Sequence, residues 1–401
     1  MLFVMWKGWY MLGRLFRQFI RPYWVSKDWP WAFGLFVLSI GMSYSLVDAM
    51  VRINYWITDF YNILQNHDKA AFAGAFVTFA VLVVYAIASF IIYVVASSVL
   101  SFRWRRWLTT KMVKDWFLYE RFYKIGLLPD TVDNPDQRIA QDVANFTDKT
   151  IGIVMALINQ LMVAISFCLI LWRIAPAFTF HVQQHDITIP GYLLWAALGY
   201  DILATLLVYW VGRKLVSLDF IQEQYEADFR YGLMRVREYR ENIAMVHGAV
   251  IEERNLDFSF QRIMQNFYKR LNYQVKIITL NNLFLNWRTV VSFALASPIY
   301  FAGMVNFGQL MQIHYAFLKV EDSFAFFRDQ FQEIVQWAAI CKRLITFYDH
   351  LDTITGRENI PESHSITVRD LVITKPNGGI IVPRINLNIQ PGEKVLLKGT
   401  N

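Results

Sequence analysis

The chain ends on residues whose types and spacing favour phosphate binding. The run 395–397 (VLL) predicts a short buried strand, and Gly399 follows it after a single lysine. A strand that enters a loop of the form G-x-x-x-x-G-K-[ST] presents backbone N–H groups to nucleotide phosphates. Gly399, Thr400 and Asn401 match the first three positions of that loop. We therefore expect them to begin a Walker A loop, and the chain to be part of a longer protein that completes it.

The segment that must position this loop carries a strand pattern. Residues 365–374 and 380–390 alternate in polarity on either side of the turn KPNGG, and residues 391–399 follow as a third strand. This pattern predicts antiparallel strands. We expect 363–401 to open a nucleotide-binding domain, which would use ATP and Mg²⁺ in the intact protein. From residues 1–401 alone we expect no catalytic residue, no bound cofactor and no ATP hydrolysis.

The rest of the chain has the composition of a membrane protein. Hydrophobic residues make up 55% and charged residues only 18%, whereas soluble domains average about 25% charged residues. The two cysteines, Cys168 and Cys341, stand alone in apolar surroundings. They are too few for a disulfide framework or a metal site, so we expect two buried thiols.

Six apolar stretches are each near the ~20 residues that a helix needs to cross a bilayer. They lie near 31–51, 73–100, 150–173, 190–211, 283–305 and 307–327. Residues 1–28 mix basic and aromatic side chains, which predicts an amphipathic helix in the membrane interface, an elbow before the first span.

The distribution of Lys and Arg predicts the orientation of these spans. Segments 1–28, 102–149 and 213–277 hold five, nine and eleven of them, whereas 174–189 and 303–309 hold none. Basic connections stay in the cytoplasm, so both termini are expected there. This bias accounts for the net charge of +7, and no nucleic-acid partner is needed to explain it.

Four motifs in the two long basic connections resemble a known group of membrane proteins. They are Arg103–Thr109, Asp133–Ala140, Glu226–Tyr231 and Arg237–Ala244. They are similar to the membrane domain of the bacterial SbmA/BacA-like and YddA-like transporters and of the subfamily D (peroxisomal fatty acyl-CoA) ABC transporters. The nucleotide-binding tail makes the YddA type the better match, because SbmA has no ATP-binding domain.

This resemblance implies a fold and an assembly. The expected fold class is an all-α membrane protein with six transmembrane helices of the ABC exporter type, long cytoplasmic helical extensions, and the opening β-strands of an ABC ATP-binding domain. The expected domains are an elbow (1–28), a membrane domain (29–350), a linker (351–362) and the nucleotide-binding start (363–401). A homodimer in the bacterial inner membrane, with one pathway between the two copies, is implied as well.

The same resemblance implies residues that couple the membrane domain to a motor. They are Asn134, Pro135, Asp136, Gln137, Arg138, Glu226, Arg230 and Glu241. Simpler readings stay open. Asp133 or Asn134 can cap the helix that Pro135 begins, and the charges of the second connection can form solvated pairs. In relatives without an ATP domain, acidic residues near Glu226 are implicated in proton coupling.

The last span is unusually polar and predicts a solute pathway. At ~100° per residue, Lys319 and Asp322 share one arc with Gln312, Asp329, Gln330 and Glu333. His314, Glu321 and Arg328 lie roughly opposite, and Phe324 belongs to an apolar packing face between them. Charged side chains that face lipid cost several kcal/mol, so these arcs should face protein or water. Lys319 and Asp322 can alternatively neutralise each other, and the part beyond residue 328 can lie in the cytoplasm.

Further pathway candidates are Asp48 in the first span and Asn282, Asn286 and Arg288 in the fifth. The function that fits best is ATP-driven movement of a bulky hydrophilic or peptide-like solute, with uptake as one direction. Two alternatives stay open, which are a motor-free, proton-coupled peptide importer and a transporter of fatty acyl-CoA. The expected partners are a second copy, membrane lipid and the solute.

Overall fold

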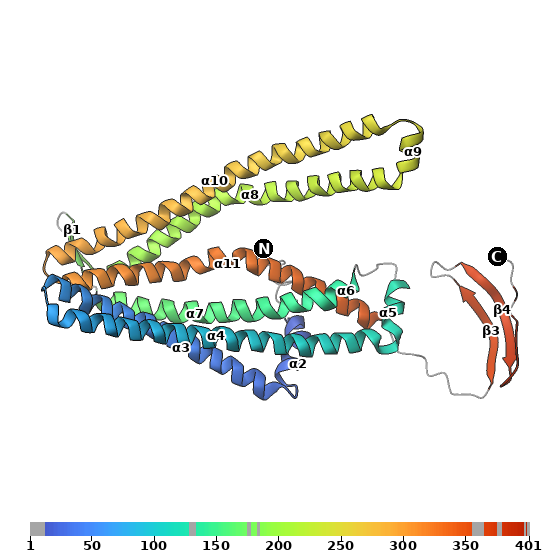
Figure 1. Ribbon diagram of the computed structural model, residues 1–401, viewed down its shortest axis with the longest axis horizontal. Coiled ribbons are helices and arrows are strands. Elements are labelled where there is room, and N and C mark those ends of the chain that lie inside the picture. Colours follow the sequence, from blue (N-terminus) through green and yellow to red (C-terminus); the bar gives the residue numbers. More distant parts are fainter. Residues whose placement is uncertain are drawn as a thin grey trace. The chain divides into compact units, whose positions relative to one another are not determined.

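The structure is a computed structural model of an almost entirely helical chain (Figure 1). It describes residues 13–127, 134–174, 178–182, 185–354, 365–374, 379–396 and 398. Gly399, Thr400 and Asn401 therefore lie outside the described residues, as does Asp133.

Six helices of 32 to 53 residues dominate the described chain. They are α3 (Trp29–Gln65), α4 (Lys69–Phe117), α7 (Val143–Ile174), α8 (Tyr192–Glu238), α10 (Ala249–Phe301) and α11 (Phe307–Thr353). Shorter helical segments are η1 (Phe16–Ile20), α2 (Arg21–Trp24), η2 (Leu118–Glu120), α5 (Arg121–Lys124), η3 (Ile125–Leu127), α6 (Pro135–Gln137), η4 (Arg138–Asp142) and α9 (Arg240–Met245). The strands are β1 (Phe178–Val182), β2 (His185–Ile189), β3 (Ile366–Thr374) and β4 (Ile380–Ile389).

Each predicted apolar stretch falls mainly within one of the six long helices, but the helices differ in character. Among the described residues, four helical stretches are long and apolar enough to cross a membrane, namely Trp29–Gln65, Lys69–Lys124, Pro135–Ile174 and Tyr192–Glu238. Helices α10 and α11 are just as long and do not reach that composition. The fifth predicted stretch also overruns its helix, since α10 ends at Phe301.

Left-handed backbone conformations interrupt the helices in the first basic connection. Tyr119 and Glu120 have φ values of 57° and 52°, which ends the long α4. Asn134 has a φ of 52° ahead of Pro135 and makes no side-chain cap hydrogen bond. The expected cap by Asn134 is therefore wrong. Its role is to adopt the left-handed turn, which asparagine tolerates better than most residues.

The described chain forms two compact units, and α3, α4, α7 and α11 each contribute residues to both. Unit 1 comprises Met1–Leu35, Ser98–Ile151 and Val335–Asn401, and unit 2 comprises Phe36–Ser97 and Gly152–Ile334.

A stripe of α4 forms the core of unit 1. Leu100, Trp104, Leu108 and Met112 recur every four residues, which places them on one helical face, and each is at most 1% exposed. Trp104 stacks on Tyr23, with ring centroids 5.7 Å apart, and donates its indole N–H to the carbonyl of Phe19 at 3.3 Å. The aromatic motif of the first connection thus holds the N-terminal elbow.

Carboxylates that each receive two arginines complete unit 1. Asp28 accepts from Arg103 at 3.4 Å and Arg106 at 3.3 Å. Asp142, which is 2% exposed, accepts from Arg138 at 2.7 Å. Arg343 of α11 donates two hydrogen bonds to Asp142, from Nε to Oδ2 at 2.9 Å and from Nη2 to Oδ1 at 2.7 Å. Because the guanidinium fork matches a carboxylate, Arg343 fixes both partners in orientation.

The core of unit 2 gathers side chains from α3, α7, α8, α10 and α11. It includes Val47, Phe167, Leu193, Ile299 and Phe317, each no more than 1% exposed. Figure 1 shows α8 and α10 as a long antiparallel pair that ends at α9.

Helices α3 and α11 approach closely at Gly308. A Cβ atom at that position would overlap the carbonyl oxygen of Thr58, so only glycine fits. The Gly308 N–H donates to Asn62 Oδ1 at 3.0 Å.

The strands agree with the sequence only in part. β3 and β4 pair antiparallel from Ile366–Ile389 to Thr374–Ile380, as expected. Residues 391–396, expected to begin a third strand, are turn and irregular chain. A strand needs a neighbouring ladder, and the described residues provide none there. The β1–β2 hairpin was not expected, although FTFHV and HDITI favour strand by their β-branched and aromatic content.

The first prediction concerns Asp142. Burial raises the pKa of its carboxyl, but hydrogen bonds from Arg343 and Arg138 outweigh burial and hold the pKa below its usual value. Replacement of Asp142 by Asn should lower the free energy of unfolding by ~3 kcal/mol at pH 7, because two arginines lose a buried partner.

A lowered folded pKa stabilises the fold above the unfolded value of about 4, and this stabilisation disappears as pH falls through the folded pKa. Unfolding in detergent should therefore separate wild type from Asp142→Asn at pH 7 and bring them together in strong acid. Asp136→Asn, at an exposed site, is the control. An equal difference in the free energy of unfolding at both pH values would contradict this explanation.

Candidate functional site

A buried ion cluster joins α10 to α11 in unit 2. Arg288 Nη1 donates to a carboxylate oxygen of Glu321, and also to Asp322 Oδ1 at 2.5 Å. The side chains of Arg288 and Glu321 are 16% and 5% exposed, whereas Asp322 is 45% exposed. One arginine therefore faces two carboxylates, of which one is buried and the other open to the surroundings.

More polar contacts continue along α11 toward its start. The imidazole Nδ1 of His314 lies 2.6 Å from the Ser292 hydroxyl, and its ring stacks on Phe293 with centroids 4.4 Å apart. Gln312, 3% exposed, donates to Asn54 Oδ1 at 3.0 Å, and Asn54 donates back to the Gln312 carbonyl at 3.1 Å. Each polar group is satisfied by a neighbouring helix, as an apolar environment requires.

Phe324 lies outside the core and lines an apolar groove. Its side chain is 36% exposed, so its assignment to a packing face is wrong. The groove encloses about 650 Å³ and is lined mainly by α8, including Leu206, Tyr209 and Val216, with Asp201 as one of its few charged residues. An exposed Phe324 gains little packing energy, and its side chain is available for contact with a ligand or lipid.

The structure separates the remaining pathway candidates from this cluster. Lys319 places its ammonium 5.5 Å from the Tyr315 ring centroid, and Asp322 pairs with Arg288. Asn282 and Asn286 donate to carbonyls of their own helix at 2.9 and 2.7 Å. Asp48 accepts from Arg52 at 2.6 Å on α3. Among these candidates, Arg288 pairs with Asp322 across two helices, and Asn286 contacts Asn282 within α10.

The first predicted coupling segment, residues 134–138, has one largely buried side chain and several exposed ones. Asp136 and Gln137 are exposed, and Pro135 begins α6. The Gln137 amide donates to Gln141 at 3.3 Å. Arg138 is only 13% exposed because it pairs with Asp142. Arg138 therefore stabilises unit 1, whereas Asp136 and Gln137 are free to meet another domain.

The predicted coupling residues of the second basic connection are exposed. Glu226 accepts from Gln222 at 3.0 Å one turn earlier, and both Glu226 and Arg230 are exposed on α8. Glu241 lies on α9 in a polar pocket of about 480 Å³ with Arg237 and Arg240. These contacts are local, and Glu226 and Arg230 are exposed on α8 while Glu241 is exposed on α9 at the tip of the hairpin.

Sequence reasoning missed residues that only the fold brings together. The helical pattern placed Glu321 and Asp322 on different faces of the last span. The Arg288 guanidinium nevertheless reaches both carboxylates, because adjacent residues on a helix point only about 100° apart. Asn54 and Asp201 were not singled out, although a polar residue within a long apolar run is itself a signal. The side chains of Arg328 and Asp329 lie outside the described residues.

The chain resembles known transport proteins over nearly all its length. A family described as ABC transporter transmembrane region 2 matches residues 15–301. The inner membrane ABC transporter ATP-binding protein YddA of Escherichia coli (strain K12) is 28% identical over 95% of this chain and 68% of its own length. ABC transporter D family member 2, chloroplastic, of Arabidopsis thaliana is 29% identical over 96% of this chain and 52% of its own.

A third relative matches half of the chain. The lysosomal cobalamin transporter ABCD4 of Mus musculus is 25% identical over 50% of this chain and 31% of its own length. The chain thus spans roughly one to two thirds of these relatives. They bear out the likeness to the YddA-like and subfamily D groups, while the likeness to SbmA/BacA stays a prediction.

The second prediction separates the two acidic partners of Arg288. Arg288→Gln leaves buried Glu321 without its cation and should lower the free energy of unfolding by ~3 kcal/mol or more. Asp322→Asn leaves one cation with one anion and should cost less than ~1 kcal/mol. Unfolding of both variants in detergent micelles checks this order. Equal losses would mean that Arg288 is held mainly by Asp322.

Proposed function

Since the chain belongs to the ABC transporter transmembrane region 2 family, we propose that it is the membrane part of a homodimeric, ATP-driven half-transporter. The Escherichia coli relative is named as an ABC transporter ATP-binding protein. The antiparallel β3–β4 pair, followed by the sequence that runs into Gly399, supports a motor in the intact protein. ATP and Mg²⁺ would bind that completed motor.

The proposed topology has six spans and both termini in the cytoplasm of a bacterial cell. Four helical stretches have the length and composition of spans. We assign α10 and α11 as the fifth and sixth, because their polar groups face one another through Arg288 and Glu321 and need not face lipid. Connections rich in Lys and Arg alternate with connections that are poor in them, which supports this orientation in the inner membrane.

Exposed apolar side chains on the α8–α10 hairpin support a second copy. Met245 and Val246 are 81% and 75% exposed at its tip, and Phe220 and Phe258 are 73% and 64% exposed. In the proposed topology this hairpin lies in the aqueous phase. Exposed apolar residues gathered there indicate an interface with another protein surface. A second copy of the chain would cover them.

The ion cluster at Arg288 carries the proposal of a bulky hydrophilic or peptide-like solute. Two carboxylates share one arginine within membrane helices, and the more exposed of them, Asp322, can exchange its partner for a cationic group of the solute. Such an exchange keeps every charge paired, which a low-dielectric pathway requires.

A second candidate cargo is a fatty acyl-CoA. The apolar groove at Phe324 favours it, because an acyl chain could lie along α8 while its anionic end stays near Arg213. The motor-free, proton-coupled alternative gains less support, since β3 and β4 keep their pairing.

We also propose that Asp136, Gln137 and the α9 tip with Glu241 transmit movement between the motor and the membrane helices. The third prediction follows from the exposure of Asp136. Asp136→Ala in the intact protein should leave thermal stability unchanged and lower ATP-dependent transport several-fold. Arg138→Ala should lower stability, because it removes a buried partner of Asp142. Unaltered transport by Asp136→Ala together with Gln137→Ala would restrict this segment to a helix start.

The fourth prediction tests the cargo. Full-length protein in proteoliposomes should lose most transport of a labelled zwitterionic peptide on Asp322→Asn, while the dimer still assembles and hydrolyses ATP. Phe324→Ala, at an exposed site, should leave peptide transport within about twofold and serves as the matched control.

The opposite pattern is equally informative. If Phe324→Ala stops transport of a labelled long-chain acyl-CoA and Asp322→Asn transports normally, the acyl-chain cargo replaces the peptide-like one. If the reconstituted protein does not hydrolyse ATP, the ATP-driven proposal fails irrespective of cargo.

A further inference from the structure

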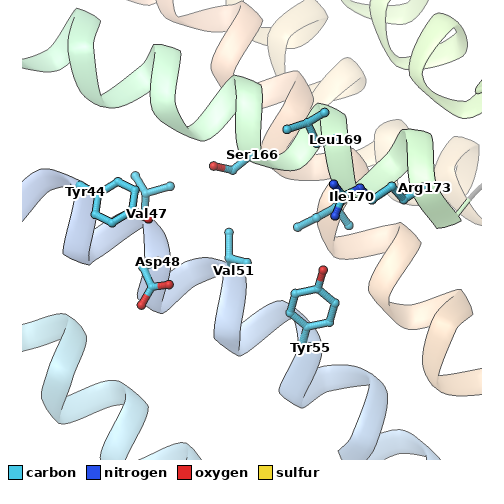
Figure 2. A pocket seen from close by; sticks show the side chains of 9 residues that line it. All are labelled: Tyr44, Val47, Asp48, Val51, Tyr55, Ser166, Leu169, Ile170 and Arg173. Atoms are coloured by element: carbon cyan, nitrogen blue, oxygen red, sulfur yellow. The ribbon is translucent and has the colours of Figure 1, made fainter.

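A small pocket lies between α3 and α7 in unit 2, away from the Arg288 cluster. It encloses about 230 Å³ (Figure 2). Tyr44, Asp48 and Tyr55 line it from α3, at spacings of four and seven residues, and Ser166 and Arg173 line it from α7, seven residues apart. Both spacings place the residues on one helical face. Two polar stripes therefore face each other across an otherwise apolar gap.

The pocket carries an excess of positive charge. The Asp48 carboxylate is engaged by Arg52, which does not line the pocket, at 2.6 Å. Arg173 makes no hydrogen bond or ion pair with any residue that the structure describes, and its side chain is exposed. One guanidinium is therefore available once Asp48 and Arg52 have neutralised each other.

The free donors converge on the same side of the pocket. Figure 2 shows the guanidinium of Arg173 and the hydroxyl of Tyr55 pointing toward one another across the gap, while Asp48 points away from them. The floor beneath is apolar, with Val47 and Ile170 only 1% and 6% exposed. A planar guanidinium and a phenol hydroxyl are both hydrogen-bond donors. Together they can bind an oxyanion, which accepts hydrogen bonds and donates none.

We infer that this pocket binds an oxyanion, a carboxylate or a phosphate monoanion, attached to an apolar group that rests on Val47 and Ile170. In the proposed topology, on which this inference rests, Arg173 lies at the outer end of the third span and Asp48 near the outer end of the first. An anion can arrive there from the solute or from the phosphate of an outer-leaflet lipid.

Arg173 also lies in the last turn of α7, where any cation is favoured by the helix dipole. Substitution distinguishes the two roles. Arg173→Lys keeps the cation at the helix end and loses the planar fork. Tyr55→Phe removes only a hydroxyl, and Lys69→Gln removes a remote exposed cation of the same proposed side as the matched control.

The test measures binding to the purified full-length protein without ATP, so that its result is independent of transport. Two pairs of probes are used, and each pair has an anionic and an uncharged member with the same apolar part. The peptide pair is N-acetyl-Ala-Ala and its C-terminal amide, titrated calorimetrically. The lipid pair is phosphatidylglycerol and diacylglycerol of equal chain length, counted on the protein by native mass spectrometry.

We expect the wild type to prefer the anionic member of at least one pair by about tenfold, the effect of one charge-assisted hydrogen bond. Arg173→Gln should abolish that preference, Arg173→Lys and Tyr55→Phe should weaken it, and Lys69→Gln should leave it unchanged. Preference for the peptide anion alone identifies a solute contact, and preference for the lipid alone identifies a headgroup site. No preference in either pair, or a preference that survives Arg173→Gln, overturns the inference.

Discussion

The need to pair every charge that leaves water shapes both units of this protein. An isolated ion in a low-dielectric interior is so costly that burial and pairing must occur together. Unit 1 meets this constraint at Asp142, which two arginines share. Unit 2 meets it in the inverse way, since Arg288 serves Glu321 and Asp322. In unit 1 the shared carboxylate, Asp142, is buried. In unit 2 one of the two carboxylates, Asp322, stays exposed.

In the proposed function, this difference separates a structural ion pair from one that meets the solute. Asp142 is enclosed, and Arg343 engages both of its oxygens, so no solute can compete for it. Asp322 keeps nearly half of its side chain exposed while Glu321 retains the arginine. A site that must bind and release a charged solute needs such a second acceptor, because the arginine is then never left without a partner.

Sequence patterns predicted the helices well and the contacts between them poorly. Long apolar runs identified the six helices. A helix satisfies its backbone hydrogen bonds within its own segment, which an apolar environment requires. The buried stripe from Leu100 to Met112 is likewise visible as a four-residue repeat. Periodicity within one helix could not show that Arg288 bridges Glu321 and Asp322, that Phe324 faces a groove, or that Arg343 reaches Asp142. Each of these contacts depends on a residue from another helix.

The close approach of α3 and α11 at Gly308 has a consequence for temperature dependence. Hydrogen bonds between Asn54 and Gln312, the bond from the Gly308 N–H to Asn62 Oδ1, and the close backbone contact at Gly308 join these helices. Polar and backbone contacts of this kind do not rely on the release of water from apolar surface, and that release is what gives burial its large heat-capacity change. The α3–α11 contact should therefore keep its strength on cooling, whereas the aromatic packing around Trp104, formed where water is the competing solvent, should weaken. In a cold membrane, the rigid part of the molecule would be the seam between its first and last long helices.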